Sequence, residues 1–122
     1  MKNSDKFYIN GEWVSPSTSE MLDVINPATT EVMGTIAMGG KADVDDAVAA
    51  AKEAFKTFSK TSKQERSELL GRIVEAYQNK MAEIAKTVSE EMGAPMGLAN
   101  AAQAPAGLCL LYTSDAADEE DS

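Results

Sequence analysis

Cys109 is the only cysteine of the chain, so a thiol nucleophile is the first chemistry to consider. A catalytic thiolate needs a neighbouring base, most often histidine, and the sequence contains no histidine. The same counts exclude an internal disulfide and a zinc site of the Cys/His type. The residues alone therefore do not favour a thiol enzyme, and a reducing, cytoplasmic compartment is the expectation.

Two other groups could carry chemistry, the glycines of GTIAMGGK (residues 34–41) and the carboxylates of Glu90 and Glu91. The glycine spacing matches neither the dinucleotide fingerprint nor the P-loop, and it favours a connection between a strand and a helix. Glu90 and Glu91 fall at an expected helix C-terminus, where the helix dipole disfavours negative charge. A cation would offset that cost, although a solvated surface is the simpler interpretation. No catalytic or cofactor-binding residue is assigned.

The net charge of −9, from 20 acidic and 11 basic residues, argues against a nucleic-acid partner. Residues 109–122 hold five of the acids and no Lys or Arg. No run of ~18 apolar residues is present for a membrane span, and the first residues do not resemble a signal peptide. We therefore expect a soluble globular chain with no membrane partner.

Short strands are expected in the first forty residues. FYINGEWV (7–14) places Asn10-Gly11, which tolerates the positive φ angles of a type I′ turn, between two β-prone runs. Residues 22–38 predict a second strand pair that is interrupted at Asn26-Pro27. Four such strands cannot enclose a core alone, so they need helices or another chain.

Two long amphipathic helices are expected at about 41–58 and 63–92. Gly40 is the predicted N-cap of the first helix, and Ser62 with Glu65 forms a capping box for the second. Gly93 and Pro95 end the second helix, and Pro105 marks a later kink or boundary. The second helix would be roughly 45 Å long at ~1.5 Å per residue, more than a compact domain of this size needs.

Four short motifs follow one another along the chain: INGEW (9–13), INPATTEV (25–32), ADVDDAVAAA (42–51) and EMGAP (91–95). Together they resemble the N-terminal region of the aldehyde dehydrogenase superfamily, across Phe7–Leu108. The resemblance implies an α+β fragment, two short β-hairpins plus two long helices, of the α/β aldehyde dehydrogenase fold. It implies oxidation of an aldehyde to a carboxylic acid with NAD or NADP.

The resemblance also implies that this segment is scaffold and not catalytic centre. The family's nucleophile lies in a Gly-Gln-x-Cys context, its base in Glu-Leu-Gly-Gly and its oxyanion-binding Asn in Pro-Trp-Asn, and none occurs here. Cys109, in GLCLL, does not inherit the nucleophile's role. The implied partners are the rest of the polypeptide and identical subunits in a homodimer or homotetramer. Many members hold K⁺ or Na⁺, and the matching residues here are Val24, Ile25 and Glu91.

The sequence character changes after Leu108. Residues 109–118, CLLYTSDAAD, back-translate with allowed codons to DNA resembling a transposon-end sequencing adapter. We therefore expect residues 1–108 to be the dehydrogenase segment and residues 109–122 to be an artefactual, disordered acidic tail. A genuine acidic tail, disordered by its charge, is the alternative.

The sequence thus predicts the N-terminal scaffold segment of an NAD(P)-dependent aldehyde dehydrogenase, inactive alone. One alternative is a small acidic helical protein–protein interaction module, which would fold cooperatively as a monomer. The other is a regulatory fragment that assembles with full-length subunits. A scaffold fragment, by contrast, should expose the apolar faces of its helices.

Overall fold

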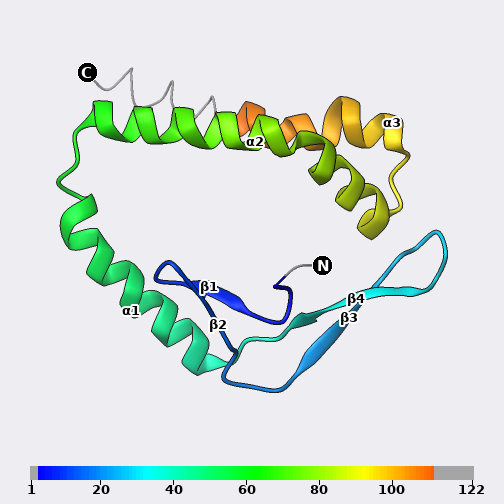
Figure 1. Cartoon of the computed structure of the whole chain (residues 1–122), viewed down its shortest axis with the longest axis horizontal. Helices are drawn as coiled ribbons and strands as arrows, with labels where there is room; N and C mark the ends of the chain where they lie inside the picture. Colours follow the sequence, from blue (N-terminus) through cyan, green and yellow to red (C-terminus); the bar gives the residue numbers. More distant parts are fainter. Residues whose placement is uncertain (1–2, 112–122) are drawn as a thin grey trace. The chain divides into compact units, whose positions relative to one another are not determined.

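The computed structural model describes residues 3–111, and these divide after Lys60 into two compact units (Figure 1). The first unit holds two β-hairpins and a helix, and the second holds a long helix with shorter helical segments. The predicted combination of two short hairpins with two long helices is confirmed.

The first hairpin pairs β1 (Phe7–Ile9) with β2 (Glu12–Val14) in antiparallel register. Ile9 lies opposite Glu12, so only two residues form the turn, Asn10 with φ 54° and Gly11 with φ 82°. Two consecutive positive φ angles are what a type I′ turn requires. The rings of Tyr8 and Trp13, which face each other across the strands, have centroids 5.2 Å apart.

The second hairpin pairs β3 (Met21–Ile25) with β4 (Val32–Ala37), also antiparallel. A register shift between Val24 and Ile25 interrupts an otherwise regular ladder. Asn26 closes the loop, because its carbonyl oxygen accepts from the Thr30 amide at 2.7 Å and its side chain accepts from the Ala28 amide at 2.9 Å. The strand therefore ends before Asn26-Pro27, as predicted.

Helix α1 (Lys41–Phe58) begins after the N-cap residue Gly40 and is anchored by Asp43. The Asp43 carboxylate accepts hydrogen bonds from the Gly40 amide at 2.8 Å, the Ser17 amide at 2.8 Å and the Ser17 hydroxyl at 2.6 Å. Only 9% of Asp43 is exposed. The bond from the Ser17 hydroxyl, ahead of that from the Gly40 amide, lowers the pKa of Asp43. Asp43 thus ties the linker between the hairpins to the start of α1.

Helix α2 (Lys63–Met92) has the predicted bounds and caps. The Ser62 hydroxyl accepts from the Glu65 amide at 3.2 Å, and the Glu65 carboxylate accepts from the Ser62 amide at 2.7 Å. Gly93, with φ 73°, ends the helix by donating its amide to the Ser89 carbonyl at 3.0 Å. The capping box and the glycine stop are both confirmed.

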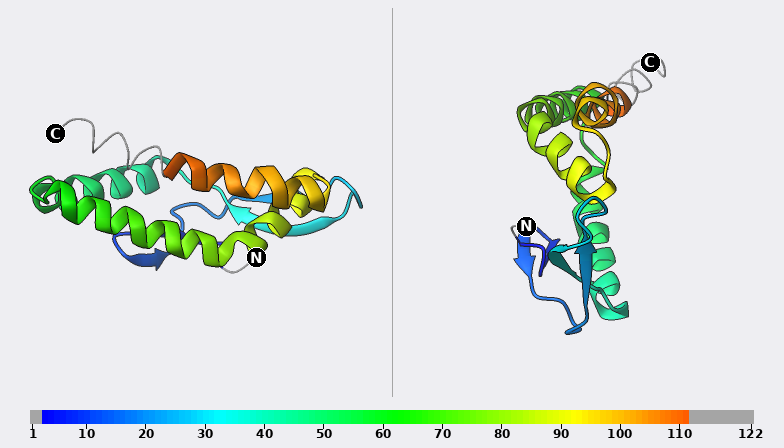
Figure 2. Two further views of the ribbon diagram at one scale, coloured as in Figure 1. Left: turned by 90° about the horizontal axis from the view of Figure 1, so that it is seen from above. Right: turned by 90° about the vertical axis from the view of Figure 1, so that its right-hand side faces the viewer.

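A broken helical segment runs back beside α2 (Figure 2). It consists of α3 (Met96–Leu98), the π-helix η1 (Ala99–Gln103) and residues 104–111, which are α-helical. Pro105 has no amide hydrogen to donate, and the wider π turn lies just before it. The predicted boundary at Pro105 therefore appears as a change of helix type.

The tail prediction needs one correction. Cys109, Leu110 and Leu111 are helical, not disordered, because the 104–111 helix continues through them. The remainder of the predicted tail, residues 112–122, lies outside the described residues.

Small side chains make the contact between α2 and the returning segment. Within residues 3–111 the buried apolar residues are all alanines, namely Ala85, Ala94, Ala99 and Ala104. The Tyr77 hydroxyl donates to the Ala104 carbonyl at 2.8 Å. Large apolar side chains remain exposed in both units, including Val44, Phe55, Phe58, Ile73 and Met92. Exposure of the helix faces is what a scaffold fragment predicts.

We predict that Gly107→Ala destabilises the second unit by about 1–3 kcal/mol. A methyl group at Gly107 would overlap the Tyr77 hydroxyl oxygen, so the ring must move and its hydrogen bond to the Ala104 carbonyl breaks. Gly71→Ala is the matched control, because nothing lies within 4 Å of its added methyl. The control should stabilise α2 by about 0.5–1 kcal/mol. Urea unfolding followed by circular dichroism measures the free energy of unfolding of both variants. Equal changes in the two variants would contradict the contact between Tyr77 and the returning segment.

We also predict that acid releases the linker from α1. Because the pKa of Asp43 is lowered on folding, its stabilisation is present above the ordinary value of 3.8 and is lost as the pH falls through the lower folded value. The chemical shift of the Ser17 amide reports this release in a pH titration by NMR.

In the variant Asp43→Asn, the Ser17 amide should have the chemical shift of the released linker already at neutral pH. Its amide nitrogen replaces one of the two acceptor oxygens and faces a donor. Asp46→Asn, at an exposed position of the same helix, is the control. A Ser17 shift that is independent of pH in the unchanged chain would refute the anchor.

Candidate functional site

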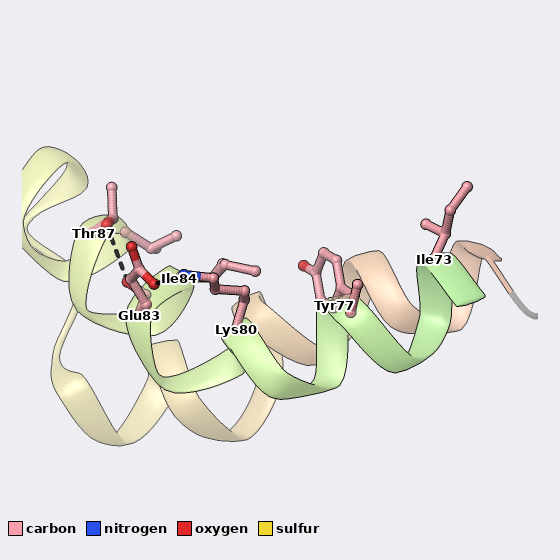
Figure 3. A pocket seen from close by; sticks show the side chains of 8 residues that line it. Ile73, Tyr77, Lys80, Glu83, Ile84 and Thr87 are labelled. Atoms are coloured by element: carbon pink, nitrogen blue, oxygen red, sulfur yellow. Dashed lines mark hydrogen bonds and ion pairs between the residues drawn. The ribbon is translucent and has the colours of Figure 1, made fainter. Parts of the chain in front are cut away.

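A groove of about 520 Å³ lies on α2, in the second unit. The groove runs along one side of the helix, and the residues that line it are spaced three or four positions apart in the sequence (Figure 3). Its lining residues are Ile73, Ala76, Tyr77, Lys80, Glu83, Ile84, Thr87 and Val88.

The groove is the uncovered half of a wide apolar surface. Met81, Ile84 and Val88 pack on the buried alanine cluster under the returning segment, and Ile84 and Val88 also line the groove. A helix normally shows one apolar stripe toward its core. The apolar arc of α2 is broad enough to serve two neighbours, and the described residues of the second unit supply only one of them.

The polar rim of the groove carries no unbalanced charge. Lys80 and Glu83 form an ion pair at 2.6 Å, with about two thirds of each side chain exposed. The hydrogen bond from Lys80, more than its charge alone, lowers the pKa of Glu83. A groove with neutral edges and an apolar floor suits an apolar occupant better than a charged one.

A smaller hollow, of about 360 Å³, lies in the first unit between the β1–β2 turn and α1. Strand β1 contributes Tyr8 and Ile9, and the turn contributes Asn10 and Gly11. The floor is made of alanines on one side of α1, namely Ala47, Ala50, Ala51 and Ala54. The sequence predicted the alanine-rich helix, but it gave no sign that the hairpin tip would lie over it.

The three residues of the predicted cation site lie in different units. Val24 and Ile25 are adjacent in β3, at the register shift, and belong to the first unit. Glu91 is exposed near the C-terminal end of α2, in the second unit. Its neighbour Glu90 lies 3.7 Å from the Lys86 ammonium group.

Cys109 is exposed on the 104–111 helix. Residues 3–111 contain no group of three or more His, Cys, Asp or Glu side chains placed to hold a metal ion. Within the same residues, no helix is both long and apolar enough to cross a membrane.

Asp43 is the polar anchor that the sequence prediction missed. Its carboxylate accepts hydrogen bonds from both the amide and the hydroxyl of Ser17. An acid three residues after an N-cap glycine is a signal for capping, and this signal was available. The partner in the serine-rich linker was not, since it lies 26 positions earlier.

Comparisons with known sequences and with solved structures point to the same protein family. The sequence matches the aldehyde dehydrogenase family over residues 13–121. A 3-succinoylsemialdehyde-pyridine dehydrogenase of a Pseudomonas species is 49% identical over 109 residues, which cover 88% of this chain and 23% of that protein. The family match passes Leu108, so it marks no boundary there, and the adapter origin of the tail stays a prediction.

Solved structures agree with the sequence match. An aldehyde dehydrogenase of Bartonella henselae superposes with a TM-score of 0.95 at 43% identity, covering 100% of this chain and 26% of that one. A mutant of aldehyde dehydrogenase C from Pseudomonas syringae, solved with NAD⁺ and octanal, superposes with a TM-score of 0.88 at 42% identity. That match covers 90% of this chain and 23% of the other. The chain therefore spans about a quarter of the length of these relatives.

Proposed function

Because the chain belongs to the aldehyde dehydrogenase family, we propose that it is the amino-terminal scaffold segment of an NAD(P)-dependent enzyme. That enzyme oxidises an aldehyde to a carboxylic acid. The observation that carries the proposal is the match of nearly the whole chain to about a quarter of each relative. The NAD⁺ bound to the Pseudomonas syringae relative supports NAD as the cofactor, and NADP is the alternative.

The segment contributes binding surface to the enzyme, and the catalytic groups lie in the rest of it. The exposed faces of α1 and α2, with the groove beside Ile73 and Ile84, support this role because apolar surface of this extent is stable only when covered. The partners are the remaining polypeptide and identical subunits, in a cytoplasmic homo-oligomer. This segment alone is inactive.

A monovalent cation, K⁺ or Na⁺, is a further part of the proposal. The carbonyl oxygens of Val24 and Ile25 and the carboxylate of Glu91 are its ligands. The register shift at Val24 and Ile25 supports this assignment, because a bulge removes backbone groups from regular ladder bonds. Glu91 at the carbonyl end of α2 supports it too, because that end carries negative partial charge that favours a cation.

The acidic interaction module remains the alternative from another functional class. The absence of large buried side chains within residues 3–111 argues against it, since a self-sufficient module needs its own core.

We predict that the chain alone produces no NADH from an aldehyde, and that activity returns when the missing part is supplied. The experiment mixes the chain with a Pseudomonas syringae aldehyde dehydrogenase C that lacks the matching segment, with NAD⁺ and octanal. NADH absorbance is the readout. Activity of the chain by itself, or none in the mixture together with cooperative unfolding of the chain alone, would refute the scaffold role.

Two variants locate the surface that restores activity. Ile73→Asp, in the groove, should lower the recovered activity at least about tenfold, because an unpaired carboxylate in an apolar contact costs more than ~1.4 kcal/mol. Gln78→Asp places the same carboxylate on the same helix outside the groove and should leave recovery unchanged.

We predict that K⁺ or Na⁺ raises the melting temperature of a hybrid in which residues 1–108 replace the matching segment of that relative. A ligand that binds only the folded state stabilises it by mass action. Glu91→Gln should abolish the rise relative to choline, a cation too large for the site. Glu90→Gln, at the residue beside Lys86, should retain it. An unchanged response in Glu91→Gln would exclude Glu91 as a ligand.

A further inference from the structure

The tip of the first hairpin combines three features that favour a covalent change. Asn10 is exposed and is followed by Gly11. Within residues 3–111, the Asn10 side-chain amide makes no hydrogen bond, and the Gly11 amide makes no backbone hydrogen bond. Nothing lies within 4 Å of the position where a side chain of Gly11 would begin. Among residues 3–111, the reacting groups are therefore neither held by partners nor shielded by neighbours.

These features meet the needs of succinimide formation. The Gly11 nitrogen, deprotonated by hydroxide, attacks the Asn10 side-chain carbonyl carbon, and a new C–N bond closes a five-membered imide. The bond from that carbon to the side-chain nitrogen breaks, and ammonia leaves with a proton from water. A residue larger than glycine would hinder the attack, and here the space is open.

We propose that Asn10 is a site of spontaneous deamidation, at which the chain converts its own hairpin turn into an isoaspartyl linkage. Water opens the imide at either carbonyl. One product has aspartate at position 10, and the other has isoaspartate, with the main chain routed through the former side chain. The only co-reactant is water, and the proposal is independent of the dehydrogenase assignment.

The isoaspartyl product does not fit the hairpin. The turn joins Ile9 to Glu12 through two residues, and the added main-chain carbon breaks that register. The contact between the Tyr8 and Trp13 rings depends on the register and is lost with it. The change also places a carboxylate in the hollow above Ala47 and Ala51, where the floor is apolar. The modification therefore alters the surface of the first unit as well as its turn.

The experiment incubates the full chain at mildly alkaline pH and maps its peptides by mass spectrometry over time. Asn100 is the internal control, because its side-chain nitrogen donates to the Met96 carbonyl at 2.9 Å and it is followed by alanine. We expect Asn10 to deamidate several times faster than Asn100, with isoaspartate as the larger product. Equal rates, or aspartate as the sole product, would overturn the proposal.

Trp13 supplies an independent readout, because it is the only tryptophan of the chain. Its fluorescence should change in step with the isoaspartate content at position 10. Asn10→Gly is the matched variant, since glycine accepts the positive φ of this position and has no amide to lose. Its fluorescence should stay constant through the same incubation. A parallel change in that variant would assign the signal to another process and overturn the structural part of the proposal.

Discussion

The carboxylate of Asp43 is the interaction on which the first unit depends, because it joins the linker between the hairpins to the start of α1. One oxygen accepts from the Ser17 amide, and the other accepts from the Ser17 hydroxyl and the Gly40 amide. The linker between the hairpins and the start of α1 thereby meet at one buried acid. Hydrogen bonds to a charged acceptor are stronger than neutral ones, which suits a unit with so little apolar burial.

The second unit relies on close backbone approach instead of charge. Ala85, Ala99 and Ala104 are fully buried between α2 and the returning segment, and small side chains permit two helices to lie near one another. The Tyr77 hydroxyl then reaches the Ala104 carbonyl, and Gly107 leaves room for the ring. This packing covers one side of α2. The groove side is left open, which explains why the unit has a well-defined contact but no large buried residue.

Local signals predicted most of the fold, because local hydrogen bonds decide these elements. Asn10-Gly11 set the first turn, Ser62 and Glu65 set the start of α2, and Gly93 set its end. The contacts from Ser17 to Asp43 and from Tyr77 to Ala104 span 26 and 27 positions, and no short motif encodes them. The helical state of Cys109 was missed because the acidic composition of residues 109–122 was taken to indicate disorder over the whole segment. The cation ligands stay a prediction, since they belong to different units.

The short sequence range of the contacts has a consequence for synthesis in a cell. Each unit closes its own hydrogen bonds within about sixty residues, so these bonds can begin to form while the chain is still emerging from the ribosome. In the proposed full-length enzyme, about four times as long, the remaining residues take many seconds to follow at about 5–20 residues per second. Throughout that interval the open side of α2 faces water or other nascent chains. The groove is therefore a surface that chaperones would need to shield until the later residues arrive.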